Sequence, residues 1–67
     1  MADPDFARNL RRLLYERQMT VKQFSRASGI NNQSVYDYLS GRHEPNCPML
    51  RRIRATLGCT WDELLGD

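Results

Sequence analysis

The sequence has no long apolar stretch, and its 67 residues leave little room for a large core. A chain this short forms one domain at most and buries only about 60% of the surface that its unfolded form exposes. The deep, enclosed pocket that most enzymes build around a substrate is therefore not expected. Since neither a run of about 18 apolar residues nor an apolar N-terminal segment occurs, we expect no membrane span, no signal peptide and a cytoplasmic location.

Side chains that bind metals or act in catalysis are also scarce. His43, Cys47 and Cys59 are the only soft metal ligands, whereas a zinc site normally needs four in closely spaced pairs. The two cysteines lie at opposite ends of a predicted helix, beyond the reach of a disulfide. The sequence has no spaced set of nucleophile, base and acid, and no glycine-rich phosphate loop. We therefore expect no metal, no cofactor, no small-molecule ligand and no enzymatic activity.

Charge is distributed unevenly along the chain. Five of the eight acidic residues lie near the two ends, whereas the stretch from Arg8 to Arg54 holds all ten basic residues and only three acidic ones, a net charge of +7. Such a segment favours a polyanionic partner, because basic side chains can replace the counterions condensed on phosphates. An ordinary solvated helix surface explains the charge equally well.

Helix caps and glycines divide the sequence into five short helices, with no strand-like alternation between them. Residues that favour N-caps precede the apolar patterns, and glycines follow three of those patterns. The predicted N-caps are Asp3, Thr20, Asn31, Asn46 and Thr60, and the predicted stops are Gly29, Gly41 and Gly58. Thr60 and Glu63 have the spacing of a capping box. The sequence therefore predicts one compact all-α domain of five helices over residues 1–67.

Apolar residues at helical spacing define the expected core. They are Phe6, Leu10, Leu13, Leu14, Phe24, Ala27, Ile30, Val35, Tyr38, Leu39, Leu50, Ile53, Leu57, Leu64 and Leu65. In the last helix, Trp61, Leu64 and Leu65 are expected to close this core. The alternative is that the exposed remainder of that helix pairs with a second copy of the chain.

The segment from Thr20 to Gly41 has the pattern of a helix-turn-helix. Two very short helices flank a tight turn, in which Gly29 can adopt the left-handed conformation and Ile30 can enter the core. This arrangement leaves the second of the two helices, residues 32–40, projecting from the domain. A projecting helix of this size fits the major groove of DNA.

The outward face of the projecting helix is polar but nearly uncharged. With Val35, Tyr38 and Leu39 directed inward, this face consists of Asn32, Gln33, Tyr36, Asp37 and Ser40. A solvated surface in an arginine-rich chain would be expected to carry charges, whereas amides and hydroxyls hydrogen-bond the edges of bases. Asn and Gln each pair bidentately with adenine, and Asn32 and Gln33 lie in the first turn, which reaches deepest into the groove. The face therefore predicts base reading, with a solvated surface as the alternative.

The order and spacing of these elements resemble the Cro and phage-repressor family of helix-turn-helix regulators, also called the Xre family. The resemblance is carried by NLRRLLYERQMT, VKQFSRASGINNQSVYDYLSGR and EPNCPMLRRIRATLGCTWDELL, which cover nearly the whole chain. It implies a repressor-like domain whose second and third helices form the helix-turn-helix. The implied base contacts are Asn32, Gln33 and Asp37, with Tyr36 beside them on a thymine methyl or a backbone sugar. The implied phosphate contacts are Thr20, Lys22, Asn31, Ser34, Ser40, Arg42 and His43.

Three positions are unusual for that family. Val21 stands where many members place a glutamine that clamps a phosphate, and Ser25 stands where an alanine is expected. The resemblance therefore implies a weaker phosphate clamp. Asp37 is unusual in a reading face, because a carboxylate repels the duplex unless it accepts a hydrogen bond from a cytosine amino group. Asp37 is thus expected either to select cytosine or to lower affinity.

Together these features predict a sequence-specific, double-stranded DNA-binding transcriptional regulator, a repressor, that reads the major groove with residues 32–40. We expect a homodimer on a palindromic operator, since one short module binds weakly alone. The alternative is a helix-turn-helix-shaped protein-interaction module, such as an antitoxin-like partner protein. Tyr36, Tyr38 and Trp61 favour that alternative, because aromatic residues anchor protein interfaces.

Overall fold

The structure is a computed structural model that describes residues 4–66. Within that part of the chain it has five α-helices and no strand, which confirms the predicted all-α fold. The helices are α1 (Pro4–Glu16), α2 (Val21–Ser28), α3 (Asn32–Ser40), α4 (Cys47–Leu57) and α5 (Trp61–Leu65). The predicted cap Asp3 lies outside the described residues.

Four helices begin where their side-chain caps predict. Each cap oxygen accepts a hydrogen bond from the backbone amide three residues further along, which satisfies one of the free amides of the first turn. The four caps are Thr20, Asn31, Asn46 and Thr60. Gly29, Gly41 and Gly58 follow α2, α3 and α4 as C-caps. The local chemistry of the sequence therefore sets the boundaries of these helices.

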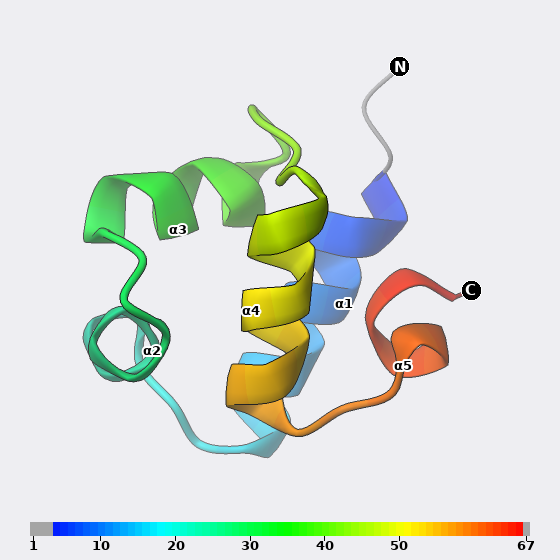
Figure 1. Ribbon diagram of the computed structural model, residues 1–67, viewed down its shortest axis with the longest axis horizontal. Helices are drawn as coiled ribbons and strands as arrows, with labels where there is room; N and C mark the ends of the chain where they lie inside the picture. The colour runs from blue at the N-terminus through cyan, green and yellow to red at the C-terminus, as the bar shows by residue number, and fades with distance from the viewer. Residues whose placement is uncertain (1–3, 67) are drawn as a thin grey trace.

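The helices pack around a small hydrophobic core. α1 packs against α3 and α5, and α2 packs against α3 and α4. Figure 1 shows α3 and α5 on opposite sides of the fold, with α1 and α4 between them. The largest fully buried side chains are Leu10, Leu13, Phe24, Val35, Ile53 and Leu64. Phe6 adds an edge-to-face contact with Tyr38, at a centroid distance of 6.4 Å. The contact between these rings ties α3 to α1.

Two of the expected core residues lie at the surface instead. Ala27 is exposed and Ser28 is buried, because Ser28 is the residue four positions after Phe24 and shares its inward face. Leu65 is 43% exposed. The helix α5 has only five residues, and Leu64 is the one that is fully buried. The predictions for Ala27 and Leu65 were therefore wrong.

Trp61 closes the core only in part, since 41% of it is exposed. The guanidinium of Arg54 lies over its ring, with Cζ 5.0 Å from the ring centroid. This cation–π contact covers one face of the indole and joins the start of α5 to the end of α4. Two other residues expected in the core, Leu39 and Leu50, are only partly buried and pack against the buried core cluster.

Long-range hydrogen bonds attach the C-terminal end to α1. The buried Asn9 donates from Nδ2 to the carbonyl oxygens of Leu64, at 3.0 Å, and Gly66, at 2.7 Å. Arg12 donates to the Glu63 carbonyl at 3.3 Å. These bonds satisfy carbonyls that α5 leaves free at its C-terminal end. We call Asn9, Arg12 and α5 the α1–α5 end.

The two cysteines have opposite environments. Both are free thiols, with Cys47 exposed at the start of α4 and Cys59 buried beyond its end. Burial raises the pKa of the Cys59 thiol, although the charge of Arg17 acts in the other direction. Of the two thiols, only Cys47 is therefore accessible to a reagent in the folded protein.

Candidate nucleic-acid interface

The turn between α2 and α3 has the sharp geometry that the sequence predicts. Gly29 has φ 76° and ψ 13°, in the left-handed region that glycine adopts without strain, and its amide donates to the Ser25 carbonyl at 2.9 Å. Ile30 then enters the core with 2% of its surface exposed. In Figure 1, α2 is seen nearly end-on while α3 runs across the view, so the two helices cross steeply.

Two serines of α2 hold the backbone of this turn. The Ser25 hydroxyl donates to the carbonyl of Ile30, and the amide of Ile30 donates to the Ser28 hydroxyl at 3.2 Å. Both polar groups of Ile30 are thereby satisfied at a buried position. Ser25, where the sequence departs from the expected alanine, therefore has a local structural role.

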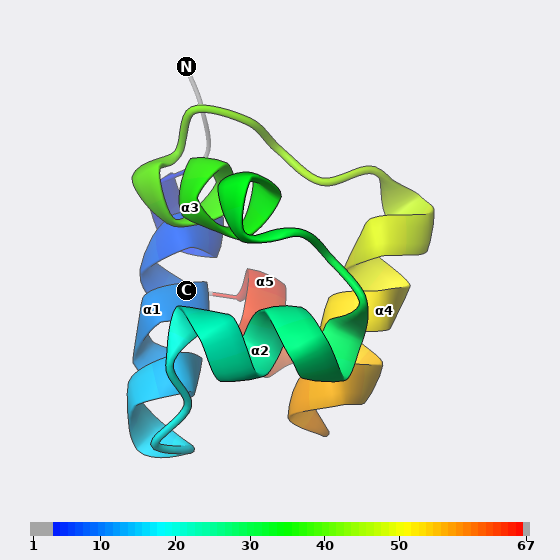
Figure 2. The ribbon, with the colours of Figure 1, turned by 90° about the vertical axis from the view of Figure 1, so that its left-hand side faces the viewer.

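The outward face of α3 is exposed in its first two turns. Asn32, Gln33 and Tyr36 are exposed, and 56% of Tyr36 is accessible. Val35 and Tyr38 are buried on the opposite side of the helix. Figure 2 shows α3 stacked on α2, at the edge of the fold. Side chains on this face can therefore reach a partner without any change in the core.

Asp37, the fourth predicted base-reading residue, is different from the other three. Only 17% of its side chain is exposed. Gln33 Nε2 donates to Asp37 Oδ1 at 3.1 Å, and His43 Nε2 lies 3.9 Å from Asp37 Oδ2. The base-reading face thus contains an internal contact between two residues that were both expected to touch bases.

The predicted phosphate contacts lie at three places around α3. They are the start of α2, the start of α3, and the end of α3 with the loop that follows it. Exposed residues there are Thr20, Lys22, Asn31, Ser40, Arg42 and His43, whereas Ser34 is only partly exposed. Lys22 and Arg42 supply cations on α2 and in the loop after α3. Both side chains are exposed, one before the turn and one after it along the chain.

Some of these polar groups already have partners in the protein. Asn31 Oδ1 accepts from the Ser34 amide at 2.8 Å, which leaves the Asn31 Nδ2 amide group for another acceptor. Ser40 Oγ donates to the Asp37 carbonyl at 3.0 Å and accepts from the Arg42 amide at 3.4 Å. The hydroxyl of Ser40 is therefore already used at the end of α3. Asn31 has more hydrogen-bonding capacity left for a phosphate than Ser40 has.

A second capping box was missed in the sequence. The Thr20 amide donates to Gln23 Oε1 at 2.9 Å, and the Gln23 amide donates to Thr20 Oγ1 at 3.1 Å. The spacing Thr-x-x-Gln is the signal that could have identified it. This box fixes the start of α2, where Thr20 and Lys22 are predicted to meet phosphate.

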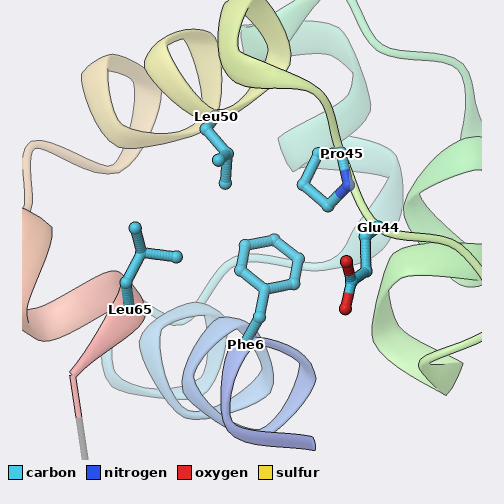
Figure 3. A pocket seen from close by; sticks show the side chains of 5 residues that line it. All are labelled: Phe6, Glu44, Pro45, Leu50 and Leu65. Atoms are coloured by element: carbon cyan, nitrogen blue, oxygen red, sulfur yellow. The ribbon is translucent and has the colours of Figure 1, made fainter. Parts of the chain in front are cut away.

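A small, mainly apolar groove lies between the start of α1, the loop after α3, α4 and α5. Its volume is about 110 Å³, and Figure 3 shows the five side chains that line it: Phe6, Glu44, Pro45, Leu50 and Leu65. Sites for small ligands typically have about 300–1,000 Å³. Among residues 4–66, no three His, Cys, Asp or Glu side chains are placed to hold a metal ion. The outward face of α3 therefore remains the candidate site.

These features define a class of protein: an all-α domain with a tight helix-turn-helix and an exposed polar second helix is a DNA-binding module. The Cro/C1-type helix-turn-helix DNA-binding domain family matches residues 9–67, and the chain belongs to this family. Comparisons with curated proteins and with solved structures give no match. No helix in the described part of the chain has the length and apolar character needed to cross a bilayer.

Proposed function

We propose that this chain is a sequence-specific transcriptional regulator that reads the major groove of double-stranded DNA with α3. Membership of a DNA-binding family supports DNA as the binding partner. The observation that carries the proposal of specificity is the exposed, amide-rich face formed by Asn32, Gln33 and Tyr36. Amide side chains discriminate bases by the pattern of donors and acceptors in the major groove, whereas a purely electrostatic binder would carry lysines and arginines there.

The proposed complex places the start of α3 deepest in the groove. Asn32 and Gln33 then meet base edges, and Tyr36, one turn further along, contacts a thymine methyl or a sugar. Lys22 and Arg42 bind phosphates on either side and fix the register without reading sequence. The exposed positions of all five side chains support this assignment.

We propose further that the chain acts as a homodimer and as a repressor. One α3 helix covers only a few base pairs, so a second copy on a palindromic operator would double the base and phosphate contacts. Repression requires only that the bound domain occupy the operator, and the extents of 29 × 22 × 21 Å are close to the length of one turn of DNA. Activation would need an additional contact with the transcription machinery.

Selection of bound sequences from a random duplex pool tests this function. The expected result is an enriched palindrome, with binding that weakens by orders of magnitude between about 50 and 200 mM salt. Enrichment of a single half-site would reject the proposed homodimer, while the proposal of sequence-specific DNA binding would stand. Failure to enrich any sequence, together with a flat salt response, would reject the function. That outcome would favour a protein ligand, for which the 56% exposed Tyr36 would be the anchor.

A further inference from the structure

Asp37 is poorly placed to read a base itself. It lies on α3 opposite the buried Val35 and Tyr38, yet only 17% of its side chain is exposed. One carboxylate oxygen accepts the hydrogen bond from Gln33, at 3.1 Å, and the other lies 3.9 Å from Nε2 of His43. The Gln33 amide therefore already occupies one of the acceptor positions that a cytosine amino group would need, and little of the carboxylate is exposed to a base.

We propose that Asp37 is a positioning residue that sets base specificity through the side-chain amide of Gln33. The inference rests on the proposed function, because it assumes that Gln33 meets a base. It gives a chemical reason for a carboxylate on a face that approaches phosphates. Asp37 anchors the reading amide, and its charge is covered by Gln33 and His43.

The chemistry of the contact fixes which way the amide points. A carboxylate only accepts hydrogen bonds, so the Gln33 amide must turn its Nε2 group toward Asp37. One N–H and the carbonyl Oε1 then remain for a partner. Adenine offers the complementary pair in the major groove, since its N7 accepts and its N6 amino group donates.

The same constraint works against guanine. Guanine offers two acceptors, N7 and O6, and an unconstrained glutamine could turn both of its N–H groups toward them. With one N–H held by Asp37, Gln33 would bring its carbonyl oxygen close to a guanine acceptor. The Asp37 contact therefore increases discrimination between adenine and guanine at one base pair.

The main chain of Asp37 fixes the neighbouring loop independently of its carboxylate. Its carbonyl accepts from the amides of Arg42, at 3.0 Å, and His43, at 3.4 Å. Substitution of the side chain leaves these main-chain bonds in place. Alanine also has a higher helix propensity than aspartate, so Asp37→Ala is expected to remain folded.

The test compares sequence selection by the parent, Asp37→Ala, Gln33→Ala and the double variant. Asp62→Asn is the control for the loss of one negative charge, because Asp62 is exposed and lies on α5, on the other side of the fold (Figure 1). Asp37→Ala should reduce the preference for adenine over guanine at one position roughly tenfold. It should also tighten binding to unrelated duplexes, since a negative charge near phosphate is lost. Asp62→Asn should leave the preference unchanged.

The double variant separates positioning from direct reading. If Asp37 acts through Gln33, adding Asp37→Ala to Gln33→Ala changes no base preference. If Asp37→Ala alters a preference in either background at a base pair that Gln33→Ala leaves unchanged, Asp37 reads a base itself, and the inference is overturned while the proposed function stands. If the parent enriches no sequence, the proposed function fails and the inference with it.

Exchange of side-chain amide protons in the free protein provides a readout without DNA. The Nε2 protons of Gln33 should exchange more slowly in the parent than in Asp37→Ala. Gln23 is the internal reference, because its Oε1 rather than its Nε2 makes the capping bond. Equal exchange for Gln33 and Gln23 in the parent would overturn the positioning role, whatever the result with DNA.

Discussion

The α1–α5 end and the outward face of α3 both carry amide side chains, but these make different kinds of contact. At the α1–α5 end, Asn9 directs its side-chain donors at two main-chain carbonyls of the chain's own C-terminal segment. On the face of α3, the side chain of Asn32 makes no hydrogen bond to any other residue between 4 and 66, and it is exposed.

The difference separates stability from recognition. A buried amide that loses its partner costs free energy, whereas an exposed amide exchanges one water for another. Substitution at Asn9 should therefore act on folding, and substitution on α3 should act on binding.

Asn9→Ala should lower the free energy of unfolding by about 2–3 kcal/mol, because it leaves the carbonyls of Leu64 and Gly66 without their donor. Urea unfolding followed by circular dichroism measures this loss. Asn32→Ala is the matched control and should change stability by no more than about 0.5 kcal/mol. Similar losses for the two variants would show that the buried amide of Asn9 contributes no more to stability than the exposed amide of Asn32.

Gln33→Ala should weaken binding to the selected DNA site by about 1–3 kcal/mol and relax preference at one base pair, with little effect on stability. Arg42→Ala is the companion variant. It should weaken binding to all sequences alike and reduce the salt slope by about one, since a phosphate contact carries no base information. Titrations at several salt concentrations distinguish the two. A loss confined to one sequence for Arg42→Ala would contradict its role.

The two capping boxes provide a pair of matched sites, one at the start of α2 beside the predicted phosphate contacts and one at the start of α5. Thr20→Ala and Thr60→Ala should each cost about 1 kcal/mol of stability, because each removes the oxygen that accepts an amide of the first helical turn. Only Thr20→Ala should also weaken DNA binding in variants that are fully folded, since Thr20 lies at the start of α2. Equal affinities for the two folded variants would argue against a phosphate contact near Thr20.

The smallest expected effect is on how the stability of the protein depends on acidic pH. The carboxylate of Glu63 accepts the Thr60 amide, and this bond lowers the pKa of Glu63 below its ordinary 4.5. A lowered folded-state pKa means that the stabilisation is complete above 4.5 and is lost as the pH falls through the lower, folded value. Glu63→Gln should therefore show a shallower loss of stability on acidification. Parallel curves for parent and variant would rule this linkage out.

Features that depend on local chemistry were predicted well from the sequence. The caps Thr20, Asn31, Asn46 and Thr60, and the left-handed turn at Gly29, depend on residues within one helical turn of each other. Such patterns can be read directly from spacing. The exposure of Asn32 and Gln33 also followed from helical periodicity. The helix-turn-helix could therefore be located before the structure was known.

Features that depend on distant parts of the chain were not predicted. The bonds from Asn9 join residues 55 and 57 positions apart, so they follow from how α5 docks and not from any local pattern. The approach of His43 to the Asp37 carboxylate depends on the path of the loop that carries His43. Whether the predicted base and phosphate contacts form remains a prediction, because those contacts need DNA.

Because one cysteine is exposed and the other is buried, the opening of the fold can be followed by chemical modification of the native thiols, without an engineered label. A thiol reagent should modify Cys47 at once, since it is exposed, and reach Cys59 only when the segment between α4 and α5 opens. The rate of the second modification thus reports how often that segment opens. DNA that binds only the folded protein should slow this second modification and leave the first unchanged, provided that Cys47 lies outside the bound surface.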